Sequence, residues 1–86
     1  MKKSDKIRRY GPCQSCHGRV VERLLTVDRR FDGKLHEFEN VPVGVCEECG
    51  QRVFKGPVLE RMEHLAGDKS LVKKTFRVPV MEYQPA

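Results

Sequence analysis

Two short motifs of the form Cys-x-x-Cys constrain this chain more than any other feature. Cysteine occurs four times in the 86 residues, and all four cysteines belong to these motifs. Each motif presents two thiolates from one tight turn, and two such turns can enclose one metal ion in a tetrahedral cage of four sulfur atoms. The four candidate ligands are Cys13, Cys16, Cys46 and Cys49.

A chain of this size needs support beyond its core. Its length suits one small domain, apolar residues make up 38% of it, aromatic residues 7%, and tryptophan is missing. A structural zinc site contributes about 10–16 kcal/mol of apparent binding free energy, more than the roughly 3–5 kcal/mol that a core of this size supplies. We therefore expect one structural Zn²⁺ ion, and we expect its removal to unfold the centre of the chain.

Three other chemistries use cysteine pairs at this spacing. An Fe(SCys)₄ centre takes the same ligands, so the choice between iron and zinc stays open at this point. A redox dithiol belongs in a βαβ setting, which this sequence does not predict. The stretch from Cys13 to His17 also matches the Cys-x-x-Cys-His pattern of haem attachment. That interpretation implies export and leaves Cys46 and Cys49 without a role, so zinc is favoured.

A cage of four thiolates has no open coordination position for a substrate, so we expect the metal to be structural and the protein not to be an enzyme. No phosphate-binding loop, nucleophile elbow or His-Glu metal helix is recognisable. The carboxylates of Glu47 and Glu48 are expected to face solvent between the second pair of cysteines. His36 and His64 are expected to be exposed polar residues.

The segment between the cysteine pairs predicts a β-hairpin. Residues 19–31 are rich in β-branched and apolar types, and a return strand is expected over about 34–43. Asp32-Gly33 between them is the signature of a type I′ turn, in which both residues take positive φ. The expected facing pairs are Phe31 with Lys34, Val27 with Phe38, and Leu24 with Val41. These pairs leave the choice of the buried face open.

A helix and a strand are expected after the second cysteine pair. Pro57 suits the first helical position, and Gly67 is expected to end the helix as its C-cap. The residues 72–83 alternate between apolar and polar types, which is typical of a strand, and Pro79 favours an edge position. The apolar stripe expected along the helix consists of Val58, Leu59, Met62, Leu65 and Ala66.

These elements predict a small α+β fold stabilised by zinc. A β-hairpin lies between two Cys-x-x-Cys knuckles, and one α-helix and a C-terminal edge strand follow. The expected organisation is a flexible basic arm over 1–11, a zinc-binding domain over 12–67, and a C-terminal strand or tail over 68–86. The formal net charge is +5. No targeting signal or membrane-spanning segment is recognisable, so a cytoplasmic protein without membrane contact is expected.

The spacing and the residues around the cysteines resemble a known family. The chain has Cys-x-x-Cys-x-Gly over 13–18, Gly33 in the middle of the hairpin, and VPVGVCEECG over 41–50. Together with the short helix, this block resembles the YgiT-type zinc finger, which is the N-terminal, toxin-binding zinc domain of MqsA-type antitoxins. The resemblance covers roughly 12–66, and the stretch over 41–50 is its most specific part.

The resemblance implies a structural zinc held by the four cysteines and a surface that neutralises a cognate toxin of a prokaryotic type II toxin–antitoxin system. Full-length MqsA-type antitoxins continue into a helix-turn-helix domain that binds DNA. The residues after Gly67 are too few for such a domain, so this chain resembles a stand-alone form. Acidic residues are expected to contact the toxin, and the candidates are Glu37, Glu39, Glu47, Glu48, Glu60 and Glu63.

Two other partners are consistent with the sequence. The C-terminal strand offers unpaired backbone groups, and adding it to another sheet would also make a homodimer. A nucleic-acid-binding zinc ribbon is the alternative function, based on the basic arm and on Arg29 and Arg30. It is not favoured, because the few aromatic residues are needed for the core.

Overall fold

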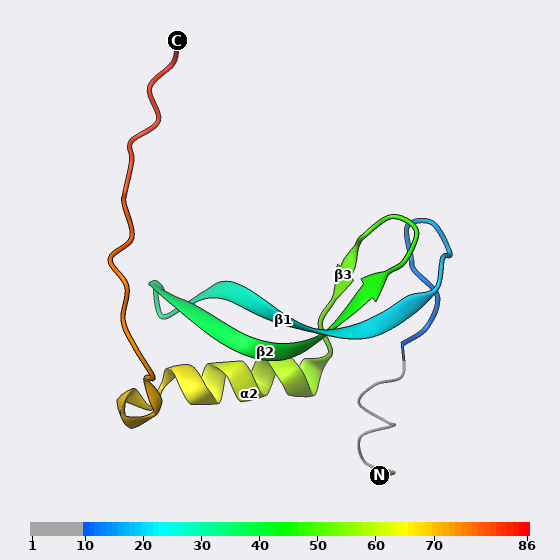
Figure 1. Ribbon diagram of the computed structural model, residues 1–86, viewed down its shortest axis with the longest axis horizontal. Coiled ribbons are helices and arrows are strands. Elements are labelled where there is room, and N and C mark those ends of the chain that lie inside the picture. Colours follow the sequence, from blue (N-terminus) through cyan, green and yellow to red (C-terminus); the bar gives the residue numbers. More distant parts are fainter. Residues whose placement is uncertain (1–9) are drawn as a thin grey trace.

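The computed structural model describes residues 10–86, so residues 1–9 of the expected basic arm lie outside the described part of the chain. The described residues form a small α+β structure with a three-stranded antiparallel sheet and one α-helix (Figure 1). This confirms the expected fold class. None of the helices in the described part of the chain has the length and apolar character needed to cross a membrane.

Two long strands dominate the structure. β1 (Val20–Phe31) and β2 (Lys34–Cys46) form an antiparallel hairpin, and the short strand β3 (Arg52–Val53) pairs with the end of β2. The strand order is β1-β2-β3. The helix α2 (Gly56–Ala66) and the 3₁₀-helix η1 (Lys69–Leu71) follow. β3 was not expected from the sequence, because two residues are too few to show an alternating pattern.

The turn of the hairpin lies where the sequence predicts it. Asp32 and Gly33 separate the two strands and take φ values of 53° and 74°. Positive φ at both positions is the requirement of a type I′ turn, whose twist matches that of the flanking strands. The predicted hairpin is therefore confirmed, although β2 runs further than expected and ends at Cys46 itself.

A β-bulge in β2 shifts the strand register halfway along the hairpin. Val27 faces Phe38 as predicted, but Leu25 faces Val41, so the predicted pair of Leu24 with Val41 is wrong. The extra residue lies in β2, where Asn40 takes a φ of 59°. One extra residue in a strand moves all the side chains that follow it to the opposite face of the sheet. Phe38 and Val41 therefore both face the core, which they could not do in a regular strand.

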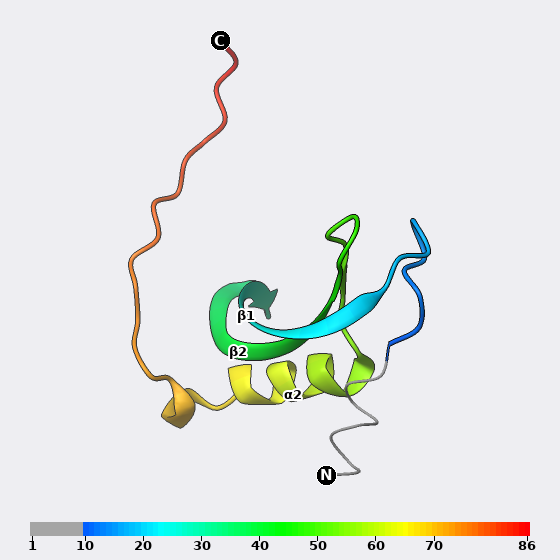
Figure 2. The ribbon, with the colours of Figure 1, turned by 45° about the vertical axis from the view of Figure 1, so that its right-hand side comes forward.

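The core lies between one face of the sheet and α2. Figure 1 shows α2 running along the hairpin beneath β2, and Figure 2 shows the same layering from another side. On the helix, the expected apolar stripe is buried or half-buried. The buried cluster consists of Val27, Val41, Val43, Val58 and Met62, with Leu25, Phe31, Phe38, Val45, Phe54 and Leu59 packed around it.

Both ends of α2 lie where the sequence predicts them. The helix begins with a proline in its first turn, and Gly67 is its C-cap. Gly67 has a φ of −79°, so it ends the helix in a right-handed conformation and not in the left-handed one that favours glycine. The expected helix is therefore confirmed, while this glycine is not required by its backbone angle.

The C-terminal segment, residues 72–86, differs from the expectation. Among the described residues, this segment contains no strand and pairs with none of the three strands. It leaves η1 and extends away from the rest of the fold (Figures 1 and 2). The predicted C-terminal edge strand is therefore not formed. An alternating pattern shows that a segment can form a strand, but a stable strand also needs a neighbouring strand to supply its hydrogen bonds.

Candidate metal centre

The four cysteines come together at the open end of the hairpin. Cys13 and Cys16 lie in a turn that precedes β1, while Cys46 ends β2 and Cys49 follows in the next turn. The four sulfur atoms all lie within 4.8 Å of one another. Antiparallel pairing of β1 and β2 causes this convergence, because Val20 and Cys46 face each other in the register.

The first turn is held by two backbone hydrogen bonds. The amide of Cys13 donates to the carbonyl of Gly18 over 2.9 Å, and the amide of His17 donates to the carbonyl of Cys13 over 2.8 Å. His17 has a φ of 62°, which is uncommon for a residue other than glycine. The left-handed residue directly after the second cysteine reverses the chain toward β1.

The second turn repeats this pattern residue by residue. The amide of Cys46 donates to the carbonyl of Gln51 over 2.9 Å, and the amide of Gly50 donates to the carbonyl of Cys46 over 3.0 Å. Gly50 has a φ of 80° and occupies the position that His17 holds in the first turn. The two motifs, far apart in the sequence, therefore adopt one local structure and approach each other as a matched pair.

Backbone amides donate to the sulfur atom of the first cysteine in each turn. The amides of Cys49 and Glu48 lie 3.5 and 3.4 Å from Cys46 Sγ, and these hydrogen bonds lower the pKa of Cys46 to about 6. The corresponding amides of the first turn lower the pKa of Cys13. Such bonds favour the thiolate, which is the form that binds a metal.

The second cysteine of each turn behaves differently. The amide of Gly18, 3.4 Å from Cys16 Sγ, acts to lower the pKa of Cys16, but the neighbouring thiols, Cys46 foremost, raise it to about 12. The pKa of Cys49 is also raised, chiefly by the thiol of Cys13, against the lowering effect of a backbone amide. Four adjacent sulfur atoms cannot all carry negative charge in the absence of a cation, whereas a bound cation stabilises all four thiolates.

The spacing of the sulfur atoms matches a metal cage and excludes disulfides. Cys13 Sγ lies 3.6 Å from Cys49 Sγ, and Cys16 Sγ lies 3.4 Å from Cys46 Sγ. A disulfide has a length of about 2.05 Å, and the cysteines are free. Tetrahedral zinc with Zn–S bonds of about 2.3 Å separates its sulfur ligands by about 3.8 Å. The donor set therefore fits a metal ion of this kind.

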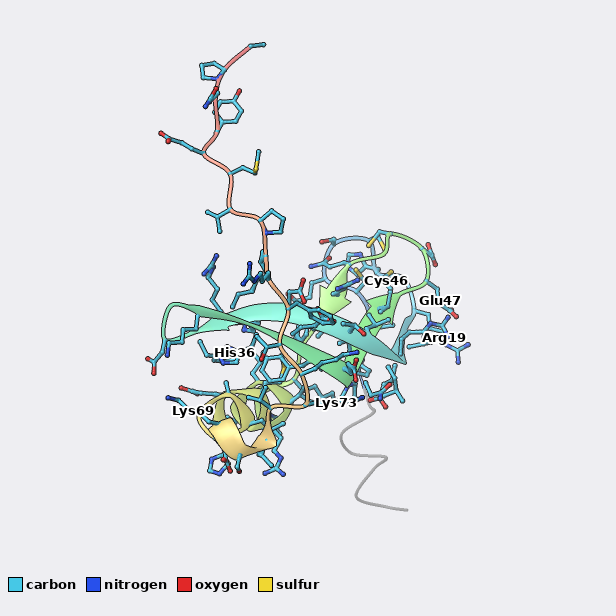
Figure 3. All side chains as sticks on the ribbon, turned by 60° about the vertical axis from the view of Figure 1, so that its left-hand side comes forward. Arg19, His36, Cys46, Glu47, Lys69 and Lys73 are labelled. Atoms are coloured by element: carbon cyan, nitrogen blue, oxygen red, sulfur yellow. The ribbon has the colours of Figure 1, made fainter. Side chains whose placement is uncertain are left out.

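The centre is partly shielded from solvent. Cys13 and Cys46 are 1% and 2% exposed, whereas Cys16 and Cys49 lie at the surface. Figure 3 shows Glu47 and Arg19 beside Cys46 at this end of the sheet, and the amide of Glu47 donates to the carbonyl of Arg19 over 2.9 Å. Four sulfur donors complete a tetrahedral shell, so the geometry suits a structural site.

Gly18 allows the two turns to approach closely. A Cβ atom at this position would lie 2.9 Å from Cys46 Sγ, which is closer than side chains tolerate, and 3.1 Å from Cys16 Sγ, which is a tight contact. Glycine is thus the residue that fits between the sulfur atoms. This glycine belongs to the Cys-x-x-Cys-x-Gly motif over 13–18, but the spacing of the motif alone does not show that it lies against the cysteine of the other turn.

The histidines lie apart from the sulfur cluster. His64 is exposed on α2 and His17 is exposed in the first turn. His36 is half-buried, so the expectation of an exposed polar residue is wrong for it. Its ring lies 6.2 Å from that of Phe31 and 6.1 Å from that of Phe38. Positions two residues apart share a face of the strand, and that rule places His36 beside Phe38.

Tyr10 supports the site and was not recognised in the sequence. A Cβ atom on Gly44 would lie 2.6 Å from carbon atoms of the Tyr10 ring, so the ring packs directly on the β2 backbone. The hydroxyl of Tyr10 donates to Glu22 Oε1 over 3.2 Å, and Lys55 Nζ lies 4.8 Å from the ring centroid. This contact anchors the chain just before Cys13. A lone tyrosine in a polar segment carries no periodic signal that would predict it.

Comparison with protein-family models, with curated proteins and with solved structures finds no match to this chain.

Proposed function

We propose that Cys13, Cys16, Cys46 and Cys49 hold one structural Zn²⁺ ion, and that the chain is a protein-interaction module of the antitoxin type. In this proposal it binds and neutralises a cognate toxin, as the MqsA-type antitoxins do, whose zinc domain the residues 12–66 resemble. The observation that carries the proposal is the cage of four converging sulfur atoms, which supports a structural metal site.

Zinc is proposed over iron because a structural site needs no redox chemistry, although soft thiolates suit both metals. The two metals differ in colour, since an iron–thiolate centre absorbs visible light and zinc does not. Elemental analysis and an absorption spectrum of the purified chain decide between them. We expect one zinc ion per chain and no visible band, and a red protein with stoichiometric iron would contradict the assignment.

Exposed carboxylates are the proposed contacts for the toxin. Glu47 and Glu48 project from the second cysteine turn, whereas Glu60 and Glu63 lie on α2, and all four are exposed. A toxin that acts on RNA carries positive charge around its active site, and acidic groups favour association with such a surface. A partner of this kind would bind more weakly as the salt concentration rises.

Co-expression with the product of the adjacent gene tests the proposal. We expect the two proteins to purify as one complex and the chain to relieve the growth arrest that the adjacent product causes. Reversing the charge of Glu47 and Glu48 together, and separately of Glu60 and Glu63, identifies the contact surface, because each double variant is the control for the other. Absence of a complex and of growth relief with the zinc-loaded chain would rule the proposal out.

Nucleic-acid binding is the second candidate, and the end of the hairpin favours it. Phe31, His36 and Phe38 form a cluster of rings, with Phe31 and Phe38 edge-to-face at 5.8 Å. Arg29 and Lys34 face His36 and Phe31 across the strands and are exposed. Rings beside cations are among the elements that bind single-stranded nucleic acids, although Phe31 and Phe38 also pack around the buried cluster. Fluorescence anisotropy with single-stranded RNA at increasing salt tests this candidate, and absence of salt-dependent binding would remove it.

A further inference from the structure

The C-terminal segment exposes an unusual amount of apolar surface. Phe76 and Val78 are 59% and 56% exposed, and Val80, Met81 and Tyr83 are more than four-fifths exposed. The segment extends away from the sheet and the helix in both ribbon views (Figures 1 and 2). Large apolar side chains in a continuous stretch of this kind mark an interaction surface.

The composition of this segment is that of a strand. Residues 72–80 alternate, with Val72, Lys74, Phe76, Val78 and Val80 on one side and Lys73, Thr75, Arg77 and Pro79 on the other. β-branched and aromatic residues in alternation favour a half-buried strand. In the described structure no strand pairs with the segment, so its strand-forming backbone and its apolar side are open to a partner.

An ion pair joins the start of the segment to its own sheet. Lys73 Nζ lies 2.9 Å from Glu39 Oε1, and in this ion pair the ammonium of Lys73 lowers the pKa of Glu39 while the carboxylate of Glu39 raises the pKa of Lys73. Figure 3 shows Lys73 where the segment passes the sheet. Beyond this contact the chain leaves the sheet, so the residues from Phe76 onward are presented outward and not folded back.

The sheet has a matching acceptor edge in β1. β1 lies at the end of the strand order, and within residues 10–86 no strand pairs with its outer edge. It contains no proline, and the bulge lies in β2. The outer edge of β2, by contrast, carries Pro42 and the bulge at Asn40, two features that discourage strand addition. β1 and the residues 72–83 are equally long.

The apolar surfaces also match. The sheet face away from α2 carries Glu22 and Asp28 on β1, and Leu24 between them is 64% exposed. The C-terminal segment carries Lys74 on the side of Phe76 and Val78, whereas Arg77 lies on the other side. A strand added at β1 with Phe76 and Val78 on the side of Leu24 covers this apolar side chain and brings Lys74 to the face that carries Glu22 and Asp28, although Arg30 also lies on that face. The apolar contact is therefore what favours this pairing.

We propose that residues 72–83 of one copy add as a strand to the β1 edge of a second copy, and that the second copy returns the same contact. Reciprocal exchange of identical segments gives a closed dimer with two-fold symmetry. The inference goes beyond toxin binding and is independent of it. A dimer without any toxin, or a toxin complex without this dimer, separates the two proposals.

Sedimentation velocity of the zinc-loaded full chain tests the dimer at concentrations from about 1 µM to about 1 mM. We expect a concentration-dependent dimer, and we expect Phe76→Asp to raise the dimer dissociation constant by about tenfold or more. Thr75→Asp is the matched control, because it adds the same charge at the neighbouring position on the other side of the strand. Its effect should remain below about threefold. A chain that stays monomeric throughout, or equal effects of the two variants, would overturn the proposal.

A second experiment identifies the acceptor strand. In a mixture of isotope-labelled and unlabelled full chains, we expect intermolecular nuclear Overhauser effects between the residues around Val78 and those around Leu24. The amides of 73–78 should become protected from hydrogen exchange as the concentration rises. Protection that is independent of concentration, with contacts inside one chain only, would show that the segment pairs with its own sheet and would refute the exchange. Intermolecular contacts to another edge would refute β1 as the acceptor.

Discussion

Gly18 fits into a space that no other residue can occupy without moving a sulfur atom. A Cβ atom there would press on Cys46 Sγ and Cys16 Sγ, at 2.9 and 3.1 Å. We therefore expect Gly18→Ala to weaken zinc binding by about 10- to 100-fold, the usual range for groups that orient metal ligands. Competition with a chromophoric chelator measures this change.

Gly11→Ala is the matched control for this prediction. Gly11 also lies near the first cysteine pair, but no heavy atom lies within 4 Å of the Cβ position it would gain. Its zinc affinity should stay within about twofold of the unchanged chain, as is usual for exposed positions. Equal affinities for the two variants would mean that the sulfur cluster adapts to the additional methyl group.

Tyr10 allows a second measurement on a single residue. Burial, and then the charge of Glu22, raise the pKa of Tyr10 from 10.0 to about 12. The folded chain thus holds this proton more tightly than the unfolded chain. The Tyr10 contribution to the free energy of unfolding is fully present below pH 10 and is lost as the pH rises through about 12.

Absorbance of tyrosinate in a Tyr83→Phe variant measures this pKa, because Tyr10 is then the only tyrosine in the chain. We expect a midpoint near 12, and a lower midpoint when Glu22→Gln is added, because the carboxylate charge is removed. A Tyr10 pKa near 10.0 both with and without Glu22→Gln would show that the ring does not pack on Gly44 as described.

The β-bulge decides which apolar residues of β2 face the core. Asn40 adopts a φ of 59°, which asparagine and glycine tolerate and β-branched residues do not. We expect Asn40→Val to lower the free energy of unfolding by about 1–2 kcal/mol relative to Asn40→Gly. Urea unfolding of both zinc-loaded variants measures the difference. If the two variants are equally stable, the bulge is not held by this backbone angle.

The hairpin shows how far local sequence signals reach. Asp32-Gly33 predicted the turn and the two pairs nearest to it, because a type I′ turn determines the register of its own strands. The prediction failed beyond Val27, where the bulge at Asn40 moves Val41 opposite Leu25. A lone asparagine in a strand is compatible with a turn, a bulge or a regular position, and the choice depends on which face α2 covers.

The C-terminal segment shows a different limit. Its alternation predicted a strand, and the structure leaves residues 72–86 unpaired. The alternating pattern shows that the segment favours a strand conformation. Pairing also requires the free edge of another strand, and within the described residues of one copy no such edge pairs with the segment. The convergence of the four cysteines was easier to predict, because the two cysteine turns repeat the same short-range hydrogen bonds and need only antiparallel strands to meet.

The whole fold is expected to depend on the metal. The buried cluster around Val43 and Met62 is small, and such a core supplies roughly 3–5 kcal/mol. We expect chelation of zinc, or the substitution Cys46→Ser, to unfold residues 12–67 cooperatively, because closing the cage joins the two turns. Far-ultraviolet circular dichroism and amide chemical-shift dispersion measure the loss.

Ser15→Ala is the matched control for Cys46→Ser. Ser15 lies between Cys13 and Cys16 in the first turn and is exposed. This variant should bind zinc and keep its amide dispersion. A Cys46→Ser chain that also keeps its dispersion and its circular dichroism would show that the sheet and α2 fold without the ion.

The hairpin is closed at both ends, by Asp32-Gly33 at one end and by the cluster of sulfur atoms at the other. The turn at Asp32-Gly33 joins the two strands through the chain itself. The proposed link between the cysteine turns, by contrast, exists only while a metal ion is bound. By mass action, each tenfold fall in free zinc then lowers the free energy of unfolding by about 1.4 kcal/mol. Proteases that attack the open form remove the chain in proportion to its population. Its abundance in a cell would therefore follow the supply of zinc, with no dedicated sensor.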